Sequence, residues 1–232
     1  MITIYRFSHG RTNSKAGLLS TEEMKVLNLY AGIGGNRKLW QDVEVTAVEW
    51  DEETAKVYSD YFPDDTMIVG DAHQYLLDHY KEFDFIWSSP PCPTHSIYNN
   101  MKRVGMEKYP DMSLYQQIIF LNHWYDGKFC IENVVPYYQP LIAGKEIARH
   151  LFWSNFTITS NGLKKIDGNP INSWNVEDYE KEYGYDMSLY EMSRNKKRKA
   201  LRNCVIPELG LHILNAARNI ITKSNTEQTT LF

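Results

Sequence analysis

Short apolar runs alternate along this chain with longer segments in which apolar residues recur at helical spacing. The runs at residues 25–30, 43–48, 66–69, 83–87 and 128–131 have the length and composition of buried strands. The segments between and after them predict helices, at residues 36–40, 52–61, 73–80, 111–124 and 209–221. Strands that alternate with helices form a mostly parallel, doubly wound sheet. We therefore predict an α/β fold that binds its ligands at the carboxyl ends of the strands.

Polar stretches divide the sequence into unequal parts. Residues 94–110 predict a loop, and residues 157–201 form the least regular part of the chain, rich in asparagine, lysine and tyrosine. We expect one domain built from residues 1–156 and 202–223. A small irregular segment at 157–201 interrupts it, and a flexible tail follows at 224–232.

The composition is that of a globular protein with one sizeable core. Of its 232 residues, 43% are hydrophobic and 13% aromatic. No apolar run approaches the roughly 20 residues that a membrane span needs. The amino-terminal residues lack the layout of a signal peptide, and three cysteines without paired spacing oppose both a disulfide framework and a zinc site. We therefore expect a cytoplasmic protein without a metal site.

The net charge of −4 weighs against nucleic-acid binding unless positive charge is concentrated in one place. Residues 194–202 provide such a concentration. The basic residues of this run are Arg194, Lys196, Lys197, Arg198, Lys199 and Arg202. A run of this kind is a candidate contact to a phosphate backbone, and its alternative interpretation is the solvated face of a helix.

A glycine-rich turn follows the first apolar run, in the sequence Asn28-Leu29-Tyr30-Ala31-Gly32-Ile33-Gly34-Gly35. Glycines let the backbone approach a ligand closely, and such a turn directs a helix N-terminus at that ligand. Glu49 ends the next strand at the spacing of an acid that binds ribose hydroxyls, and Trp50 beside it can stack on an adenine. Asp71 ends the third strand, where it could accept from the adenine amino group. Together these strand ends favour an adenosine-containing ligand over tight packing alone.

The segment Trp87-Ser88-Ser89-Pro90-Pro91-Cys92-Pro93 places a single cysteine after the fourth apolar run. The two prolines before Cys92 restrict its backbone and polar residues follow it, which favours an accessible nucleophile over a buried structural thiol. Glu132 ends the fifth run. A thiolate that attacks an electron-poor ring and a carboxyl group that protonates the ring would complement each other. Cys130 is expected in the core, and no pattern assigns chemistry to Cys204.

Three signatures together resemble those of the DNA cytosine-C5 methyltransferase family. They are the glycine-rich turn, Pro90-Pro91-Cys92 and Glu132-Asn133-Val134. The resemblance covers residues 25–140 strongly and residues 202–213 more weakly. It implies a Rossmann-like fold that binds S-adenosyl-L-methionine. It also implies a covalent mechanism, in which Cys92 adds to C6 of a flipped cytosine while Glu132 supports a proton at N3.

The resemblance extends to further site residues. Cofactor contacts are implied at Tyr30, Ala31, Gly32, Gly34, Gly35, Glu49, Trp50, Asp71, Ala72, Pro91, Asn203 and Val205. Arg149 is the candidate for the arginine near the flipped base, although the family's usual run with several arginines is absent. Contacts to DNA are expected at Ser96, Lys102, Arg103, Arg194, Lys196, Lys197, Arg198 and Lys199.

The sequence departs from the family pattern in two places. Pro93 stands where the family usually has glutamine, which puts part of the substrate contact in doubt. The recognition region can only be residues 157–201, which are too few for an elaborate reader of base edges. We therefore expect short or relaxed sequence preference on double-stranded DNA. The compact form suits a restriction-modification or phage enzyme that acts as a monomer in a bacterial or phage-infected cell.

Other functions remain open on the sequence. The closest alternative is an RNA cytosine-C5 methyltransferase of the same fold, and a second is a non-catalytic DNA-binding protein. Free cytosine nucleotides are a third substrate class, which the basic run disfavours. The tail Gln228-Thr229-Thr230-Leu231-Phe232 resembles the pentapeptide with which bacterial replication proteins dock on the sliding clamp. Gln228, Leu231 and Phe232 would make that contact, and packing of Phe232 on the protein itself is the alternative.

Overall fold

One mixed β-sheet organises the molecule. The computed structural model describes residues 3–5, 23–97, 109–159 and 174–219. Within these residues, eight strands form a sheet in the order β1-β4-β3-β2-β5-β6-β8-β7. The strands are β1 (Thr3–Tyr5), β2 (Met24–Leu29), β3 (Val43–Glu49), β4 (Thr66–Val69), β5 (Phe85–Ser88), β6 (Lys128–Val134), β7 (Lys145–Ile147) and β8 (His150–Ser154). The five central strands from β4 to β6 are parallel; β1 pairs antiparallel with β4, β8 with β6, and β7 with β8.

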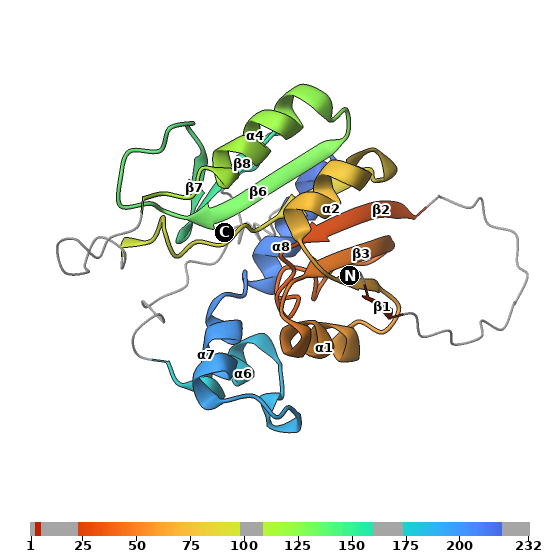
Figure 1. Ribbon diagram of the computed structural model, residues 1–232, viewed down its shortest axis with the longest axis vertical. Helices are drawn as coiled ribbons and strands as arrows, with labels where there is room; N and C mark the ends of the chain where they lie inside the picture. The colour runs from red at the N-terminus through yellow and green to blue at the C-terminus, as the bar shows by residue number, and fades with distance from the viewer. Residues whose placement is uncertain (1–2, 6–22, 98–108, 160–173, 220–232) are drawn as a thin grey trace, which may run out of the picture.

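Helices cover both faces of the sheet, as the prediction of a doubly wound fold requires (Figure 1). The helices of the sheet layers are α1 (Glu52–Tyr61), α2 (Ala72–His79), α4 (Ser113–Trp124) and α8 (Pro207–Ala217), and η1 (Tyr80–Glu82) continues α2. α2 and α4 pack on one face, around Leu27 and Ile86. α8 packs on the other face, around Val26 and Phe85, and α1 packs on Ala47. Adjacent residues of β2 and β5 thus belong to opposite layers, as the alternation of side chains along a strand dictates.

The register brings the strand ends to one edge of the sheet. Leu29 of β2 pairs with Val48 of β3 and with Ser88 of β5, and Ser88 pairs in turn with Ile131 of β6. Residues that follow these positions therefore emerge side by side. The glycine-rich turn, Glu49, the cysteine segment and Glu132 all lie at this edge.

The predicted helix at residues 36–40 is wrong, because the structure has consecutive turns there. The amide of Arg37 bonds the Gly34 carbonyl at 3.1 Å, and the amide of Trp40 bonds the Arg37 carbonyl at 3.0 Å. The Arg37 guanidinium also donates a hydrogen bond to the Trp40 carbonyl at 2.8 Å and binds the Asp65 carboxylate. These bonds close the segment on itself, so no helix N-terminus lies behind the glycines.

The segment at residues 157–201 is more regular than its composition predicts. Its described part, from residue 174, contains α6 (Val176–Tyr183), η2 (Met187–Leu189) and α7 (Arg194–Arg202). α6 begins with a capping box between Asn175 and Asp178 and ends at Gly184, which has φ +66°. Local capping therefore specifies helices in a polar sequence. α6 and α7 lie side by side at the bottom of Figure 1.

This helical segment shares a hydrophobic core with the sheet domain. Tyr179 and Met187 pack in one cluster with Ile33 of the glycine-rich turn and Val57 of α1. The Lys38 ammonium donates to the carbonyls of Tyr183 and Gly184 and so fixes the end of α6. Among the described residues, no helix is long and apolar enough to span a membrane.

Candidate active site

The three glycines of the turn have different tasks. A Cβ at Gly32, which has φ +57°, would meet nothing within 4 Å. A Cβ at Gly34, which has φ +84°, would lie 2.3 Å from the Phe62 ring, and one at Gly35 would lie 2.6 Å from the Cys204 Cβ. Gly34 and Gly35 therefore permit close packing inside the protein. Gly32 alone borders open space, where a ligand can approach the backbone.

The acidic strand ends surround this open space. Glu49 accepts the amide hydrogen of Gly32 at 2.9 Å and that of Asp51 at 3.0 Å, so its carboxylate orders both loops. The neighbouring Trp50 is 75% exposed, which leaves its ring available for stacking. Asp71 caps α2 through one oxygen, Oδ1, which accepts from the His73 and Gln74 amides. Open backbone at Gly32, the exposed Trp50 ring, the half-buried Glu49 carboxylate and the exposed Asp71 carboxylate fit the adenosine part of a nucleoside cofactor.

The remaining predicted cofactor residues lie close to this turn. Ala31 and Ala72 are buried beside Tyr30 and Asp71, and Pro91 is exposed next to Cys92. Val205 also lies beside this turn, because a Cβ at Gly35 would lie 2.7 Å from the Val205 carbonyl. Asn203, two residues earlier, is exposed. The fold therefore brings together several of the residues at which the resemblance implies cofactor contacts.

A buried chain of hydrogen bonds holds the Tyr30 side chain, and no sequence pattern predicted it. Gln117 of α4 is fully buried; its Nε2 donates to the Tyr30 hydroxyl at 2.9 Å, and its Oε1 accepts from the Ser88 hydroxyl at 2.7 Å. Burial raises the pKa of Tyr30 to about 12. Tyr30 also has φ +55°, an uncommon conformation for a non-glycine residue. A glutamine at an inward position of a helix has no sequence signature, which is why the prediction missed it.

Cys92 lies four residues beyond the end of β5, in a segment tied down on both sides. Its carbonyl accepts from the His95 and Ser96 amides at 3.0 Å each, and Asn133 Nδ2 donates to the Pro90 carbonyl at 2.9 Å. The thiol is half-buried. Burial and the nearby Glu132 raise its pKa, so the thiol carries its proton at neutral pH.

Glu132 supplies a carboxyl group inside the protein, beside the thiol. It is 7% exposed in β6, and burial raises its pKa to about 7, a shift that the Ser89 hydroxyl and Arg149 limit. His150 Nε2 lies 3.6 Å from its Oε1. Burial also lowers the pKa of His150 to about 3, so this ring is uncharged. Glu132 therefore keeps its proton up to about pH 7, as a group that must donate a proton requires.

The comparison with sequence families agrees with this arrangement. The family described as C-5 cytosine-specific DNA methylase matches residues 24–136, which include the glycine-rich turn, Cys92 and Glu132. These residues form a domain of that family. The methylase domain implies a methyltransferase acting at cytosine C5, with S-adenosyl-L-methionine as the methyl donor. The comparison with curated proteins gave no match.

One solved structure shows that the chain has the fold of a methyltransferase, and two others are similar over about half of the chain. The Entamoeba histolytica methyltransferase EhMeth superposes with a TM-score of 0.54 and 11% identity, over 88% of this chain and 100% of that chain. A mutant of Spodoptera frugiperda DNMT2 is 28% identical over 48% of this chain and 35% of that chain, with a TM-score of 0.36. A SAM-dependent methyltransferase from Agrobacterium tumefaciens is 14% identical over 51% of this chain and 41% of that chain, also with a TM-score of 0.36.

Arg149 connects the methylase domain to the carboxyl end of α7. It follows Ala148, which has φ +55°, in the tight turn between β7 and β8. Its Nη2 donates to the Arg202 carbonyl at 3.0 Å and to the Cys204 carbonyl at 3.3 Å. Arg149 thus lies near Glu132, as expected for a residue of the base pocket, but much of its hydrogen-bonding capacity serves the protein itself.

Other predicted residues have mixed outcomes. Ser96 is half-buried in the turn after Cys92. Cys130 is fully buried, as predicted, and Cys204 is 5% exposed. The predicted DNA contacts Lys102 and Arg103 lie outside the described residues, as do the clamp-motif residues Gln228, Leu231 and Phe232.

His95 is a further buried polar residue near the nucleophile that the sequence did not single out. It is 1% exposed, and its Nδ1 lies 2.6 Å from the Tyr138 hydroxyl. Burial lowers its pKa, so the ring is neutral. His95 belongs to a polar stretch that predicts an exposed loop, so the sequence did not indicate that its side chain is buried.

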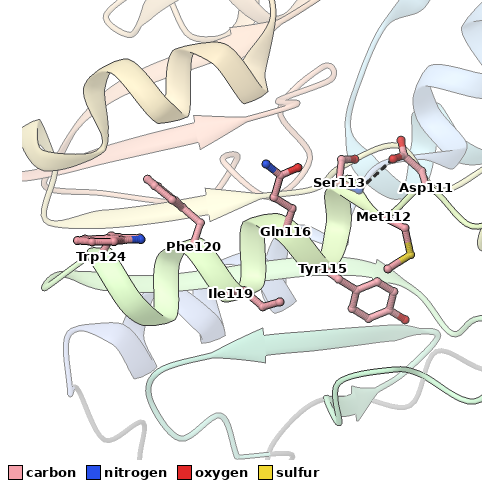
Figure 2. A pocket seen from close by; sticks show the side chains of 8 residues that line it. All are labelled: Asp111, Met112, Ser113, Tyr115, Gln116, Ile119, Phe120 and Trp124. Carbon is pink, nitrogen blue, oxygen red and sulfur yellow. Dashed lines mark hydrogen bonds between the residues drawn. The ribbon is translucent and has the colours of Figure 1, made fainter.

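A groove runs along the exposed side of α4 (Figure 2), and one of its lining residues, Tyr115, packs edge-on against the His95 ring. Met112, Ile119 and Trp124 line it and are 54%, 61% and 60% exposed. None of the residues predicted to bind cofactor or substrate lines this groove. The reactive groups lie instead at the carboxyl edge of the sheet.

Proposed function

We propose that this chain transfers a methyl group from S-adenosyl-L-methionine to C5 of cytosine in double-stranded DNA, with short or relaxed sequence preference. One observation carries the proposal. The parallel strands β5 and β6 bring the Cys92 thiol and the protonated Glu132 carboxyl to the same edge of the sheet. A nucleophile and an acid that converge in this way suit addition to a pyrimidine ring.

The first step builds a covalent adduct on a flipped cytosine, because C5 and C6 cannot be attacked in line within the base stack. The Cys92 thiol gives up its proton to solvent water, and its sulfur forms a bond to C6. Glu132 donates its proton to N3 as electrons move through the ring. C5 thereby becomes an enamine-like nucleophile, and the loss of ring conjugation is offset by the new carbon–sulfur bond.

The second step transfers the methyl group and restores the ring. When bound, S-adenosyl-L-methionine would supply an electrophilic methyl group to C5, and its methyl–sulfur bond would break to leave S-adenosyl-L-homocysteine. Solvent water then takes the proton from C5, the C5–C6 double bond re-forms as the Cys92 sulfur departs from C6, and Glu132 recovers the proton from N3. The residues around Gly32, Glu49 and Trp50 would hold the donor, since they offer open backbone, ordered carboxylate and an exposed ring.

The proposal is tested with the Cys92→Ala variant. Labelled S-adenosyl-L-methionine should give no product with this variant on duplex DNA, whereas its binding to the donor should match wild type. Bisulfite sequencing of DNA from cells that express the wild-type chain should report methylated cytosines and their sequence context. Substantial cytosine methylation by Cys92→Ala would refute the assignment of the nucleophile.

The main alternative is methylation of cytosine in RNA by the same two residues. A comparison of duplex DNA with transfer RNA as substrate separates the two proposals. Methyl transfer to RNA alone would replace the DNA proposal and leave the roles of Cys92 and Glu132 intact. Failure on both substrates would favour a non-catalytic DNA-binding protein.

The tail sequence supports a separate proposal about partners. Gln228, Leu231 and Phe232 would dock in an apolar pocket of the bacterial sliding clamp, which would raise the local concentration of the enzyme at replicated DNA. Removal of residues 228–232 should then abolish binding to purified clamp. Unchanged binding, or no binding by the full chain, would reject this proposal.

A further inference from the structure

The basic residues of α7 fall into two groups with different surroundings. Toward the start of the helix, Arg194 pairs with Glu177 at 2.9 Å, and the Arg198 guanidinium donates to the Trp174 carbonyl at 3.0 Å. Lys197 lies close enough to Asp186 to lower the pKa of that carboxyl group, together with the Ser188 hydrogen bonds, which have the larger effect. These cations face α6 and the segment that follows it.

Lys196 fastens the helix to the sheet domain. Its ammonium lies 2.7 Å from Asp51 and 2.6 Å from Glu53, at the start of α1. The side chain is 33% exposed, and Asp51 also caps α1 through the Thr54 amide. A lysine shared between two carboxylates is neutralised, so Lys196 contributes little to the attraction of a distant anion.

Lys199 and Arg202 occupy the other end of α7 and have no carboxylate partner within 4 Å among the described residues. Three positions separate them, so they share one side of the helix. Lys199 is exposed and Arg202 is half-buried. Both act electrostatically on Cys92, in the direction that stabilises its thiolate.

Hydrogen bonds fix this end of α7 beside the acid. Arg149 Nη2 holds the Arg202 carbonyl at 3.0 Å, and the next residue, His150, approaches Glu132 to 3.6 Å. The Asn203 amide continues the helical pattern by bonding the Lys199 carbonyl at 3.1 Å. The carboxyl end of α7 therefore lies beside the Cys92–Glu132 site, and the backbone that carries the two cations is anchored there.

We infer that Lys199 and Arg202 bind the phosphates that flank the cytosine presented to Cys92, whereas Arg194, Lys196 and Arg198 hold α7 in place. This inference rests on the proposed function and narrows the expected nucleic-acid contact from the whole basic run to its carboxyl end. A phosphate needs an accessible cation that no carboxylate has neutralised, and the end of α7 offers two. Favourable interaction with the helix dipole explains why cations are tolerated there, but not why they face the nucleophile.

Salt dependence of binding tests the inference, with matched variants on one helix. The probe is a fluorescent 20-base-pair cytosine-containing duplex, titrated at several NaCl concentrations. Each phosphate contact contributes about 0.9 to the slope of log K against log salt. Lys199→Gln and Arg202→Gln should each reduce that slope by about one such unit, and Lys199→Arg should restore it. Arg194→Gln and Lys197→Gln remove the same charge and should leave the slope unchanged.

The outcomes separate this inference from the proposed function. If wild type binds and methylates the duplex but Lys199→Gln and Arg202→Gln keep the full slope, the assignment of the phosphates is wrong and the enzyme proposal survives. An equal loss of slope in Arg194→Gln would also overturn the division of the helix. If wild type binds no duplex, both fail for DNA. If Lys199→Gln and Arg202→Gln then show the same loss of slope with transfer RNA as the probe, Lys199 and Arg202 bind phosphates of RNA instead. Thermal unfolding of each variant identifies any that is misfolded, and for Arg202 the Arg202→Lys variant keeps the charge.

Discussion

At the scale of single residues, the site depends on two groups, Cys92 and Glu132, whose pKa values are raised above their ordinary values. Burial keeps a proton on Glu132 up to about pH 7, and both burial and that carboxyl group keep the Cys92 thiol protonated. A site that held two anions side by side would be unstable. We expect the thiol to ionise when the substrate binds, because Lys199 and Arg202 at the end of α7 stabilise the thiolate.

The pH dependence of methyl transfer should report Glu132. Above about pH 7 the carboxyl group loses the proton that it must give to N3, so kcat/KM should fall on the alkaline side. The Glu132→Gln variant cannot deliver a proton, and its rate should be lower by about 10²-fold or more. Its residual rate should also lack the alkaline decline. A decline of the same shape in Glu132→Gln would assign it to another group.

Two glycine substitutions should separate packing from ligand binding. Gly34→Ala puts a methyl group 2.3 Å from Phe62 at φ +84°, so strain and overpacking together should cost about 2–4 kcal/mol of the free energy of unfolding. Gly32→Ala meets open space and should cost only about 1–2 kcal/mol, from its φ. Gly32→Ala should nevertheless weaken S-adenosyl-L-methionine binding, which calorimetry measures. Equal donor affinity in Gly32→Ala and wild type would contradict the proposed position of the donor.

At the scale of elements, buried polar contacts determine how the loops at the sheet edge are held. Arg37 of the glycine-rich turn makes a two-point ion pair with Asp65, ahead of β4, at 2.8 and 2.9 Å. The Tyr58 hydroxyl of α1 donates to the same carboxylate at 2.7 Å. Three segments therefore meet at one buried carboxylate, which explains the ordered turns between the glycines and β3.

Removal of one partner from this pair should be costly. The side chains of Arg37 and Asp65 are 13% and 3% exposed, so Arg37→Ala leaves a buried carboxylate without its countercharge. We expect a loss of about 3–5 kcal/mol in the free energy of unfolding, measured by urea denaturation. The double variant Arg37→Met with Asp65→Leu should recover most of that loss. A small effect of Arg37→Ala would show that solvent reaches Asp65.

The elements themselves were predictable wherever apolar periodicity was strong. β2, β3, β4 and the helix α1 follow the predicted ranges within a residue or two, because buried parallel strands have a distinct composition. The turns at residues 36–40 and the helices α6 and α7 were not, since the Arg37–Asp65 pair and the docking of α7 by Lys196 depend on residues distant in sequence. Sequence motifs located Cys92 and Glu132, whereas Gln117 and His95 required the fold.

At the scale of the whole molecule, residues 174–201 and the sheet domain share a hydrophobic cluster. In it, Tyr179 and Met187 pack with Ile33 of the glycine-rich turn. Ion pairs from Lys196 reinforce this contact beside Trp50. The segment that would contact nucleic acid therefore cannot move independently of the segment that would hold the methyl donor.

The pH dependence of the free energy of unfolding should report the raised pKa of Glu132. Its pKa is about 7 in the folded protein against 4.5 as an ordinary value, so the folded state keeps a proton that the unfolded chain releases. The free energy of unfolding should therefore fall as pH rises from about 4.5 to about 7, by about 3 kcal/mol for this group, and then level off. Subtraction of the Glu132→Gln profile from that of wild type isolates the contribution. A difference independent of pH would contradict the raised pKa.

The most direct test of the central claim is the mass of the intact protein after reaction with duplex DNA that carries 5-fluorocytosine. Fluorine replaces the C5 proton that must leave, so a Cys92 sulfur bonded to C6 cannot depart after methyl transfer. With S-adenosyl-L-methionine present, wild type should gain the mass of one methylated strand, and Cys92→Ala should gain none. An adduct formed by Cys92→Ala, or methylation of ordinary cytosine by wild type without any trapped adduct, would contradict the account.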